Sequence, residues 1–403
     1  MKKIYYGKAV YDNKEINAVI KVLRNNSLSL VDGKNVKILE KKISSLFGKR
    51  FGLMVNSGSS ANLLAVASLN FKKNSEIITP NLTFSTTVAP IYQLGLIPHF
   101  IGVEKNKFLA DPSHIERCIN KKTVAIMIPN LLGNIADWKK INSIAKKYKL
   151  KVIEDSADTI GYTLNKTNTG RYSDIVTNSF YASHIINGAG TGGIVCFNNY
   201  KLYQRAKLLR GWGRSSAHFN ESESIKHRFN VKVSGFDYDA KYIFSDIGYN
   251  FLPSEISATF AIEQIKKLNN NIRTRNKNFD YLKKFFSNYN DLFDLPEQYN
   301  NVVTPWLAFP LVIKENKYFN RKKMQIYFEQ NNIQTRTIFT GNILKQPVMK
   351  NRYYKKHPQC DAIADNVMKN GILLGCHQGM KKNELEYICN TFKKFLKFQK
   401  NKK

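Results

Sequence analysis

The sequence lacks the features that would place a protein outside the cell or in a membrane. No apolar run approaches the roughly 20 residues that span a bilayer, and Tyr5, Lys8 and Asp12 stand where a signal peptide would have its apolar core. The 5 cysteines are an odd number without a CxC or CxxC pair, which argues against a disulfide framework and a zinc site. These absences predict a cytoplasmic protein without a bound metal.

Acidic residues are also scarce, since 30 of them face 63 lysines and arginines and leave a formal charge of +33. Such an excess can indicate a nucleic acid, a membrane surface or an anionic substrate as partner. The lysines are scattered, and no basic run is interleaved with base-stacking aromatics. We therefore expect lysines spread over solvated faces and no nucleic-acid partner, although a nucleoside diphosphate sugar would also suit a positive field.

Short apolar runs alternate with helical patterns over the first two thirds of the chain. This alternation predicts a mostly parallel sheet covered by helices on both faces, an α/β fold. The predicted strands are Phe51–Val55, Glu76–Thr79, Val124–Pro129, Lys151–Glu154, Ile175–Tyr181 and Gly193–Phe197.

The pattern changes after about residue 265. A long polar helix is expected near Ile262 to Tyr289, followed by strands at Trp306–Ile313 and Ile372–Leu374. The sequence thus predicts a large cofactor-binding domain over residues 1–265 and a smaller α/β domain over residues 266–403.

The N-terminal helix is predicted from its apolar spacing. Asn13 could cap it, and Ile16, Val19, Ile20 and Leu23 fall on one face. We expect this face to be the buried one.

Small residues follow the first predicted strand, in the segment Asn56 to Asn62, and an apolar helix pattern begins there. Backbone N–H groups at such a turn can close on an anion, and the helix dipole adds to the attraction. Gly58, Ser59 and Ser60 are therefore candidates for a phosphate site without a lysine. An ordinary serine N-cap explains this motif equally well.

Glu154 and Asp155 stand at the carboxyl end of another predicted strand, which is where open parallel sheets bind ligands. A carboxylate in this position can keep a pyridinium nitrogen protonated, which makes the ring an electron sink. A helix N-cap or a surface salt bridge explains the pair equally well.

His184 lies five residues after Ser179, and a glycine-rich segment follows it. Gly188, Gly190 and Gly193 have the spacing of GxGxxG, but a strand follows them where a dinucleotide site needs a helix, so we reject that interpretation. We expect these glycines to let the backbone approach a ligand. A lone histidine is more often structural than catalytic, and only the neighbouring motif reverses that expectation.

These motifs and a fourth, which contains Asn250 in Gly-Tyr-Asn, resemble in their order and spacing the sugar aminotransferase family of fold type I pyridoxal-phosphate enzymes. The resemblance runs from Tyr5-Tyr6-Gly7 to Gly375-Cys376-His377. It implies a large domain with a mostly parallel sheet and a smaller C-terminal domain. It also implies pyridoxal phosphate or pyridoxamine phosphate as the cofactor.

The resemblance assigns the phosphate-binding residues. The turn at Gly58, Ser59 and Ser60 would bind the cofactor phosphate, and Ser179 would add a hydroxyl. Asn250 would reach the same phosphate from the neighbouring subunit, which implies a homodimer.

Other contacts are implied for the ring and the substrate. Asp155 would pair with the pyridine nitrogen, and Phe84 would stack on the ring. Arg336 is a candidate contact for a carboxylate or a phosphate, and an exposed structural salt bridge is an equally good explanation.

The family's cofactor-binding lysine falls at the sixth residue of its Ser-Phe-x-x-x-Lys pattern, and here that residue is His184. No lysine occurs between Lys166 and Lys201. This feature resembles a smaller branch, the nucleotide-sugar 3-dehydratases of 3,6-dideoxysugar biosynthesis. The loop after His184 is one residue longer than the common pattern, and Thr191 stands where the family usually has Glu.

That branch implies a cofactor held without a covalent bond, as pyridoxamine phosphate in the active form. His184 would be the base for the loss of the C3 hydroxyl from a nucleotide-linked 4-keto-6-deoxy sugar, because its ordinary pKa lies near working pH. A GDP-linked hexose or heptose is preferred by resemblance. Some relatives recycle the cofactor through an iron–sulfur cluster that needs a CxC pattern. Its absence predicts no iron–sulfur cluster and L-glutamate as the amine donor.

Two other functions stay open on the sequence alone. The chain could be a true aminotransferase that uses a different lysine, or a catalytically inactive binding homologue. The retained Asp155, Ser179 and Asn250 argue against the second.

Overall fold

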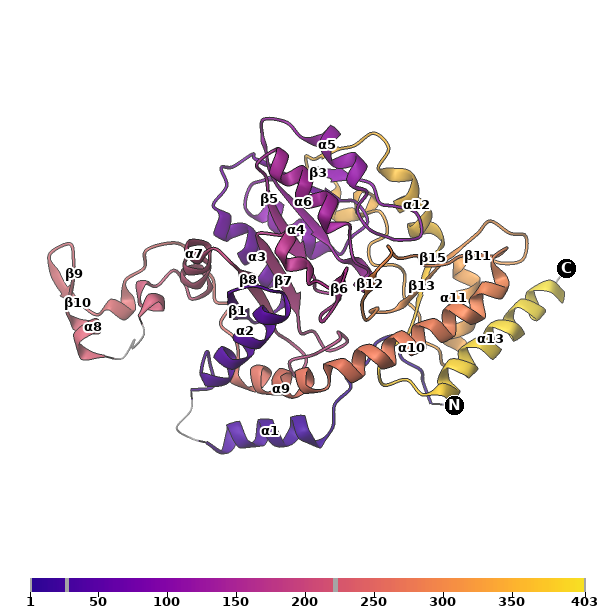
Figure 1. Ribbon diagram of the computed structural model, residues 1–403, viewed down its shortest axis with the longest axis horizontal. Coiled ribbons are helices and arrows are strands. Elements are labelled where there is room, and N and C mark those ends of the chain that lie inside the picture. The colour runs from indigo at the N-terminus through magenta and orange to yellow at the C-terminus, as the bar shows by residue number, and fades with distance from the viewer. Residues whose placement is uncertain (1, 26–28, 220–223, 402–403) are drawn as a thin grey trace.

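An eight-stranded sheet organises the chain in the computed structural model, which describes residues 2–25, 29–219 and 224–401 (Figure 1). The strand order is β1-β8-β7-β5-β4-β2-β3-β14, in which β8 runs antiparallel to both of its neighbours and the other pairs are parallel. The strands are β1 Phe51–Val55, β2 Glu76–Pro80, β3 Ile97–Ile101, β4 Thr123–Pro129, β5 Lys151–Asp155, β7 Ile175–Ser179, β8 Gly193–Phe197 and β14 Lys355–Lys356.

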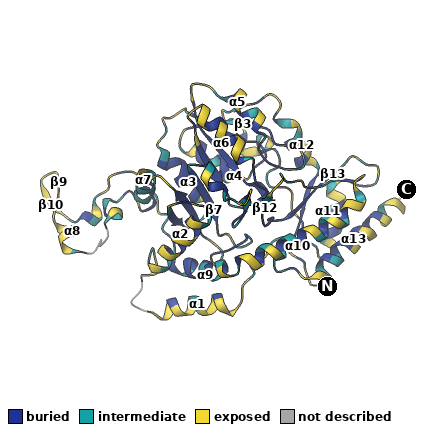
Figure 2. Ribbon diagram, viewed as in Figure 1, coloured by how far each residue is buried: buried dark blue, intermediate teal, exposed yellow. Residues whose placement is uncertain are grey.

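Helices cover both faces of this sheet because its strands are apolar on both sides. Adjacent residues of β1 show this, since Leu53 packs into one core and Met54 into the other. The buried residues accordingly gather in the sheet and on the inner sides of the helices (Figure 2). The helices that follow or flank these strands are α2 Lys34–Leu46, α3 Gly58–Leu69, α4 Ser85–Gln93, α5 Ile115–Cys118, α6 Trp138–Lys147, α7 Tyr200–Arg210 and α9 Glu255–Lys266.

The predicted α/β architecture is confirmed, and the six predicted strands are all present. Two further strands of the sheet, β3 and β14, were missed. The sequence of β3 is Ile-Pro-His-Phe-Ile, and proline and histidine hide its alternation. The two-residue strand β14 is too short and too basic to give a pattern.

The N-terminal helix differs from its prediction in two respects. Helix α1 spans Asn13–Arg24, and its N-cap is Asp12, which forms a capping box with Glu15. The predicted apolar face is also wrong, because Ile16 and Leu23 are 41% and 51% exposed. The side turned to the protein carries Glu15 instead, whose carboxylate accepts hydrogen bonds from Gln264 and Lys267.

The C-terminal part builds a smaller antiparallel sheet, β11-β13-β15, with its own aromatic core. The predicted long helix is two helices, because α9 ends at Lys266 and α10 begins at Leu268. The domain boundary after residue 265 stays a prediction, and β14 joins the large sheet from beyond it. The remaining elements here are α10 Leu268–Phe286, β11 Phe293–Asp294, β13 Phe309–Ile313, α11 Arg321–Gln330, α12 Asp361–Asn370, β15 Gly371–Leu374 and α13 Lys382–Asn401, with the small pair β6 Thr163–Leu164 and β12 Val302–Val303.

One segment stands away from both sheets. We call residues 224–247 the arm; it contains α8 Ile225–Phe229, β9 Val231–Val233 and β10 Phe236–Tyr238 and projects at the left of Figure 1. Most residues of the arm are exposed or partly exposed in this chain (Figure 2), whereas Ala240 is buried. None of the helices within the described ranges combines the length and the apolar character that a bilayer span requires.

Candidate active site

A cavity of about 450 Å³ opens at the carboxyl ends of the central strands. Gly58 and Ser59 line it at the turn from β1 to α3, where the first N–H groups of a helix have no intrahelical acceptor. Ser57 is the N-cap, and its Oγ accepts a hydrogen bond from the Ser60 N–H at 3.1 Å. The Ser60 N–H is therefore used in the N-cap hydrogen bond, while Gly58 and Ser59 face the cavity.

Ser179 closes the same corner from the end of β7. A Cβ atom on Gly58 would lie 2.6 Å from the Cβ atom of Ser179, so only glycine allows this approach. Gly58, Ser59 and Ser179 are thus brought together, which gives one pocket of hydroxyl and N–H donors suited to a phosphate.

Asp155 lies at the end of β5 and is 4% exposed. Its Oδ2 accepts hydrogen bonds from Asn62 Nδ2 and Thr87 Oγ1, both at 2.8 Å, and its Oδ1 accepts one from the Ala157 N–H at 3.1 Å. Burial raises the pKa of Asp155, and these hydrogen bonds oppose the rise. No lysine or arginine of the described residues forms an ion pair with it. The carboxyl group therefore has only neutral partners within the chain.

Glu154, the preceding residue, points to the opposite face of the sheet, as strand alternation requires. Its carboxylate accepts hydrogen bonds from Asn130 Nδ2 at 3.0 Å, from Ser173 Oγ at 3.2 Å and from the hydroxyls of Tyr162 and Thr169. Glu154 is a structural group, and only Asp155 of the pair reaches the cavity.

His184 lines the cavity beside Ser179. Its Nδ1 lies 3.4 Å from the Ser179 carbonyl oxygen, and because a carbonyl only accepts, this contact favours the tautomer with the proton on Nδ1. Burial lowers the pKa of His184 to about 4, against a rise from its backbone contacts with Ser179 and Ala157. The imidazole is therefore neutral at physiological pH. Among the described residues that line the cavity there is no lysine.

Phe84 also lines the cavity, at the N-terminal end of α4, and half of its surface is exposed. Its ring meets the edge of the Phe339 ring with 5.8 Å between centroids. Phe339 comes from the C-terminal part of the chain, so no short sequence motif could have revealed it.

Two further lining residues escaped the sequence analysis as site residues. Asp158 stands one turn after Asp155 in the segment Glu-Asp-Ser-Ala-Asp, and that spacing was the available signal. Its Oδ2 accepts a hydrogen bond from the Leu132 N–H at 2.8 Å, and burial together with the nearby Asp155 raises its pKa to about 7. Tyr6 is the second, and burial raises the pKa of its hydroxyl.

Asn250 and Arg336 do not line the cavity of this chain. Asn250 is exposed, and its carbonyl oxygen lies 3.4 Å from Asn56 Nδ2, beside the start of the phosphate turn. Arg336 is exposed as well; it donates from Nη1 to the Thr335 carbonyl at 2.8 Å.

The glycine-rich loop returns to the sheet through β8, so the rejected dinucleotide motif has no helix after it. A Cβ atom on Gly193 would lie 2.4 Å from the Ser57 carbonyl oxygen. Thr191 lines the cavity and donates its hydroxyl to the Asn56 carbonyl. The five cysteines are free and buried, and within the described ranges no group of three His, Cys, Asp or Glu side chains could hold a metal ion.

Comparison with known proteins decides the family. The sequence pattern of the DegT/DnrJ/EryC1/StrS aminotransferase family matches residues 10–393. The chain belongs to this family. GDP-4-keto-6-deoxy-D-mannose 3-dehydratase of Yersinia pseudotuberculosis is 31% identical to it over 395 residues, which cover 96% of the chain and 97% of that relative. GDP-perosamine synthase of Escherichia coli O157:H7 is 27% identical, over 90% of each chain.

Solved structures of GDP-4-keto-6-deoxymannose-3-dehydratase share the fold. The Escherichia coli enzyme with bound hydrated PLP is 30% identical, with a TM-score of 0.86 over 97% of this chain and 100% of that one. One structure holds a trapped PLP-glutamate geminal diamine and another, of a mutant, holds GDP-perosamine; both are 29% identical with a TM-score of 0.85 over 96% of this chain and 99% of those chains.

The cavity fits the pyridoxal phosphate on which this family depends. Asp155 is a buried carboxyl group without a cation from the described chain, and a protonated ring nitrogen would supply one. The donors at Gly58, Ser59 and Ser179 would hold the phosphate. Phe84 offers an aromatic face for the ring. A protonated ring nitrogen would therefore give Asp155 the cationic partner that the described residues do not supply.

Proposed function

We propose that this family member is a C3-dehydratase of a nucleotide-linked 4-keto-6-deoxy sugar, with a GDP-linked hexose or heptose as the preferred substrate. Its product is then a 3,6-dideoxy-4-keto sugar. The observation that carries the proposal is His184, a neutral imidazole at the place of the family's lysine, in a cavity whose described lining contains no lysine.

The roles of the residues follow from the cavity. The cofactor supplies an amine for the substrate's ketone and an electron sink. Nε2 of His184 accepts a proton during the loss of the C3 hydroxyl and can return it to the departing oxygen. The Ser179 carbonyl favours the tautomer in which Nδ1 carries the proton and Nε2 can accept one. Asp155 holds the ring nitrogen in its protonated form. The turn formed by Ser57, Gly58 and Ser59, which we call the Ser57 turn, binds the phosphate.

We further propose that L-glutamate reloads the cofactor amine. The PLP-glutamate adduct in a solved relative supports this donor. The spacing of the cysteines supports it as well, because the sequence has no CxC pattern for an iron–sulfur cluster. The free, buried cysteines and a nucleotide-linked substrate agree with action in the cytoplasm.

A homodimer is part of the proposal. The arm exposes a set of apolar side chains that one chain leaves uncovered, namely Ile225, Phe229, Phe236, Tyr242, Phe244 and Ile247. Asn250 follows directly and is exposed outside its own cavity. A two-fold pair of chains would cover these apolar residues and bring Asn250 to the partner's phosphate turn.

The test is a reaction panel. Purified protein is incubated with pyridoxal phosphate, glutamate and a set of 4-keto-6-deoxy sugars linked to GDP, dTDP, CDP or UDP, and the products are weighed by mass spectrometry. With a GDP-linked sugar we expect a product that has lost one oxygen atom, together with ammonia and 2-oxoglutarate, because hydrolysis restores the ketone after water has left C3. Replacement of the keto oxygen by an amine as the final product would contradict the proposal.

A sugar aminotransferase is the second candidate, favoured by the similarity to GDP-perosamine synthase. It would need a lysine that binds the cofactor covalently. Borohydride reduction of the protein with pyridoxal phosphate, followed by peptide mass spectrometry, separates the two. A labelled lysine would establish the aminotransferase, and an unlabelled chain supports the dehydratase.

A further inference from the structure

The wall of the cavity that faces away from the sheet has two halves from distant parts of the chain. Phe84 follows β2, and Phe339 belongs to the segment 337–346 that precedes α12. Their rings meet edge to face at an interplanar angle of 68°. The shape of this wall therefore depends on how the segment 337–346 is held against the large sheet.

The backbone of this segment is strained at the wall itself. Phe339 has a φ of 43°, in the left-handed region that side-chain-bearing residues avoid. Such a conformation persists only where neighbours impose it. Thr340 Oγ1 donates to the Thr83 carbonyl at 2.7 Å, and Gln346 Nε2 donates to the Thr340 carbonyl at 2.7 Å.

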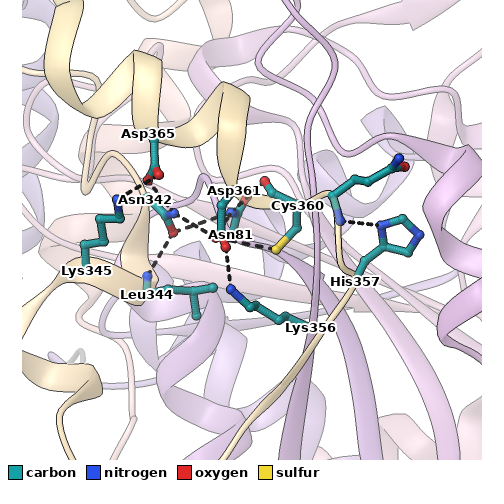
Figure 3. Close-up of polar contacts among 10 residues, drawn as sticks. Asn81, Asn342, Leu344, Lys345, Lys356, His357, Cys360, Asp361 and Asp365 are labelled. Atoms are coloured by element: carbon teal, nitrogen blue, oxygen red, sulfur yellow. Dashed lines mark hydrogen bonds and ion pairs between the residues drawn. The ribbon is translucent and has the colours of Figure 1, made fainter.

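Asn342 is the centre of the contacts that hold the segment (Figure 3). It is fully buried, and its Nδ2 donates to Asp361 Oδ1 at 3.0 Å and to Asp365 Oδ1 at 2.8 Å. Its Oδ1 accepts from the Leu344 N–H at 3.1 Å and from Asn81 Nδ2 at 3.4 Å. Both donor hydrogens and both acceptor positions of this amide are therefore in use.

Asn81 forms the other side of the contact, one residue after β2 and three before Phe84. It is fully buried, and its Nδ2 also donates to the Cys360 carbonyl at 2.9 Å. Its backbone carbonyl accepts from the Ile343 N–H at 2.9 Å, and its N–H donates to the Ile101 carbonyl at 3.0 Å. Asn81 thus ties the end of β3 to the segment that carries Phe339.

The two carboxylates are balanced by lysines on their outer oxygens. Lys345 Nζ lies 2.7 Å from Asp365 Oδ2, and Lys356 pairs with Asp361 Oδ2 (Figure 3). Burial favours a higher pKa for Asp361, but the hydrogen bonds from Lys356 and Asn342 outweigh it and lower the pKa. Asp361 and Asp365 each pair with a lysine, so a third carboxylate at position 342 would face two others and be repelled.

We propose that a group of four residues, which we call the Asn342 latch, positions Phe339 against Phe84 and thereby sets how tightly the cavity binds the sugar nucleotide. The latch consists of Asn81, Asn342, Asp361 and Asp365. The identity of the ligand rests on the proposed function. Asn81 and Asn342 are positioning residues, because neither lines the cavity. Asp155, Ser179 and the Ser57 turn lie at the ends of strands of the large sheet, and only Phe84 of the proposed cofactor contacts meets Phe339, so the latch acts more strongly on the sugar nucleotide than on the cofactor.

The test compares Asn342→Asp with the double variant Asn342→Asp/Asp365→Asn. The single variant places a third carboxylate between two others. The double variant exchanges donor and acceptor, restores the hydrogen bond between positions 342 and 365, and leaves one carboxylate, that of Asp361, facing position 342. Isothermal titration calorimetry with GDP-perosamine, on protein loaded with pyridoxal phosphate, gives the affinity. We expect about tenfold weaker binding or more in the single variant and recovery of part of it in the double variant. Cofactor affinity should change less than GDP-perosamine affinity in both.

Two further variants complete the design. Phe339→Ala should weaken GDP-perosamine binding as the single variant does, since it removes the residue through which the latch acts. Asn366→Ala is the matched control, because Asn366 is exposed on the same helix as Asp365 and bonds only Asn370. It should bind GDP-perosamine as the wild type does.

Unchanged GDP-perosamine affinity in Asn342→Asp or in Phe339→Ala overturns the latch. So does an equal loss of cofactor and sugar-nucleotide affinity without recovery in the double variant, which is the mark of general destabilisation. If the wild type binds neither GDP-perosamine nor any sugar nucleotide of the panel, the proposed function fails. The Asn342 latch is then tested by comparing amide hydrogen exchange of residues 337–346 in the wild type and the variants. Faster exchange in Asn342→Asp, reversed in the double variant, supports positioning, and equal exchange rates overturn it.

Discussion

The floor of the cavity, by which we mean Asp155, Asp158, Ser179, His184 and the Ser57 turn, differs from the arm in one respect. At the floor a single chain supplies the partners of the side chains, and on the arm it leaves them uncovered. At the floor, Asp155 is 4% exposed and receives hydrogen bonds on both carboxyl oxygens. On the arm, Phe236 and Ile247 are 74% and 92% exposed. One chain thus supplies the partners of the floor residues, whereas the arm leaves apolar side chains uncovered. In the proposed dimer, the floor would determine the chemistry, and the arm would determine whether two chains assemble into complete sites.

The largest expected effect comes from His184→Asn, which alters the floor and leaves the arm intact. An amide cannot accept the proton that the imidazole Nε2 takes, so we expect turnover to fall by a factor of about 10² to 10⁴. Cofactor binding should persist, because Asp155, Ser179 and the Ser57 turn are unchanged. Turnover is measured by mass spectrometry and cofactor binding by absorbance titration. Substantial remaining dehydration would contradict His184 as the base.

Mixing two inactive variants tests whether the floor of one chain is completed by Asn250 of the other. Asn250→Ala should be inactive through loss of the phosphate contact, and so should His184→Asn. If Asn250 acts across the interface, a mixed dimer has one site with both defects and one site with neither. Co-refolding equal amounts should therefore recover about a quarter of wild-type activity, as random two-fold assembly requires. No recovery would place Asn250 in its own chain's site.

The arm can be tested without touching the floor. Phe236→Asp places a charge among the apolar residues that we expect to be covered in the dimer, so sedimentation velocity should show a shift from dimer to monomer. The far-UV circular dichroism spectrum should stay unchanged. Lys232→Ala on the neighbouring strand is the control, since its ion pair with Asp237 is exposed, and it should remain dimeric.

The smallest effect concerns a single proton at the floor. The pKa of Asp158 is raised to about 7 in the folded protein from a reference value of 3.8. Its protonated form therefore stabilises the fold fully below about pH 4, and this contribution is lost as the pH rises to about 7. Asp158→Asn cannot titrate. We expect its melting temperature, relative to wild type, to be higher at pH 8 than at pH 5 by a few degrees. An equal difference at both pH values would show that Asp158 does not carry this proton.

Local sequence patterns were sufficient for the parts of the floor that lie at strand ends. Gly58 lies just after β1, Asp155 and Ser179 end β5 and β7, and His184 lies in the loop after β7; strands of one sheet carry such residues to one edge. Ser60 shows the limit of this reasoning, because the same Ser-rich turn supplies both a cap and a binding site. Only the structure separates the two uses.

The residues that were missed depend on contacts between distant segments. Phe339 reaches the cavity from the C-terminal part, and its local sequence has no recognisable binding motif. The exposed face of α1 was misjudged for a related reason, since periodicity reports an apolar face but not the surface that covers it. Ile16 and Leu23 are exposed in the single chain. Neither error could be corrected from spacing alone.

The antiparallel pair β7–β8 has a consequence for how new reactions arise in this fold. Ser179 pairs with Gly193, and the Phe180 N–H donates to the Gly192 carbonyl at 2.9 Å, so both ends of the loop that carries His184 are fastened. A residue inserted beyond His184 can therefore be absorbed without displacing its side chain. Under the proposed function, this frame would let residue 184 change from lysine to histidine as an independent step, so that a new reaction could appear before the rest of the sequence has adapted to it.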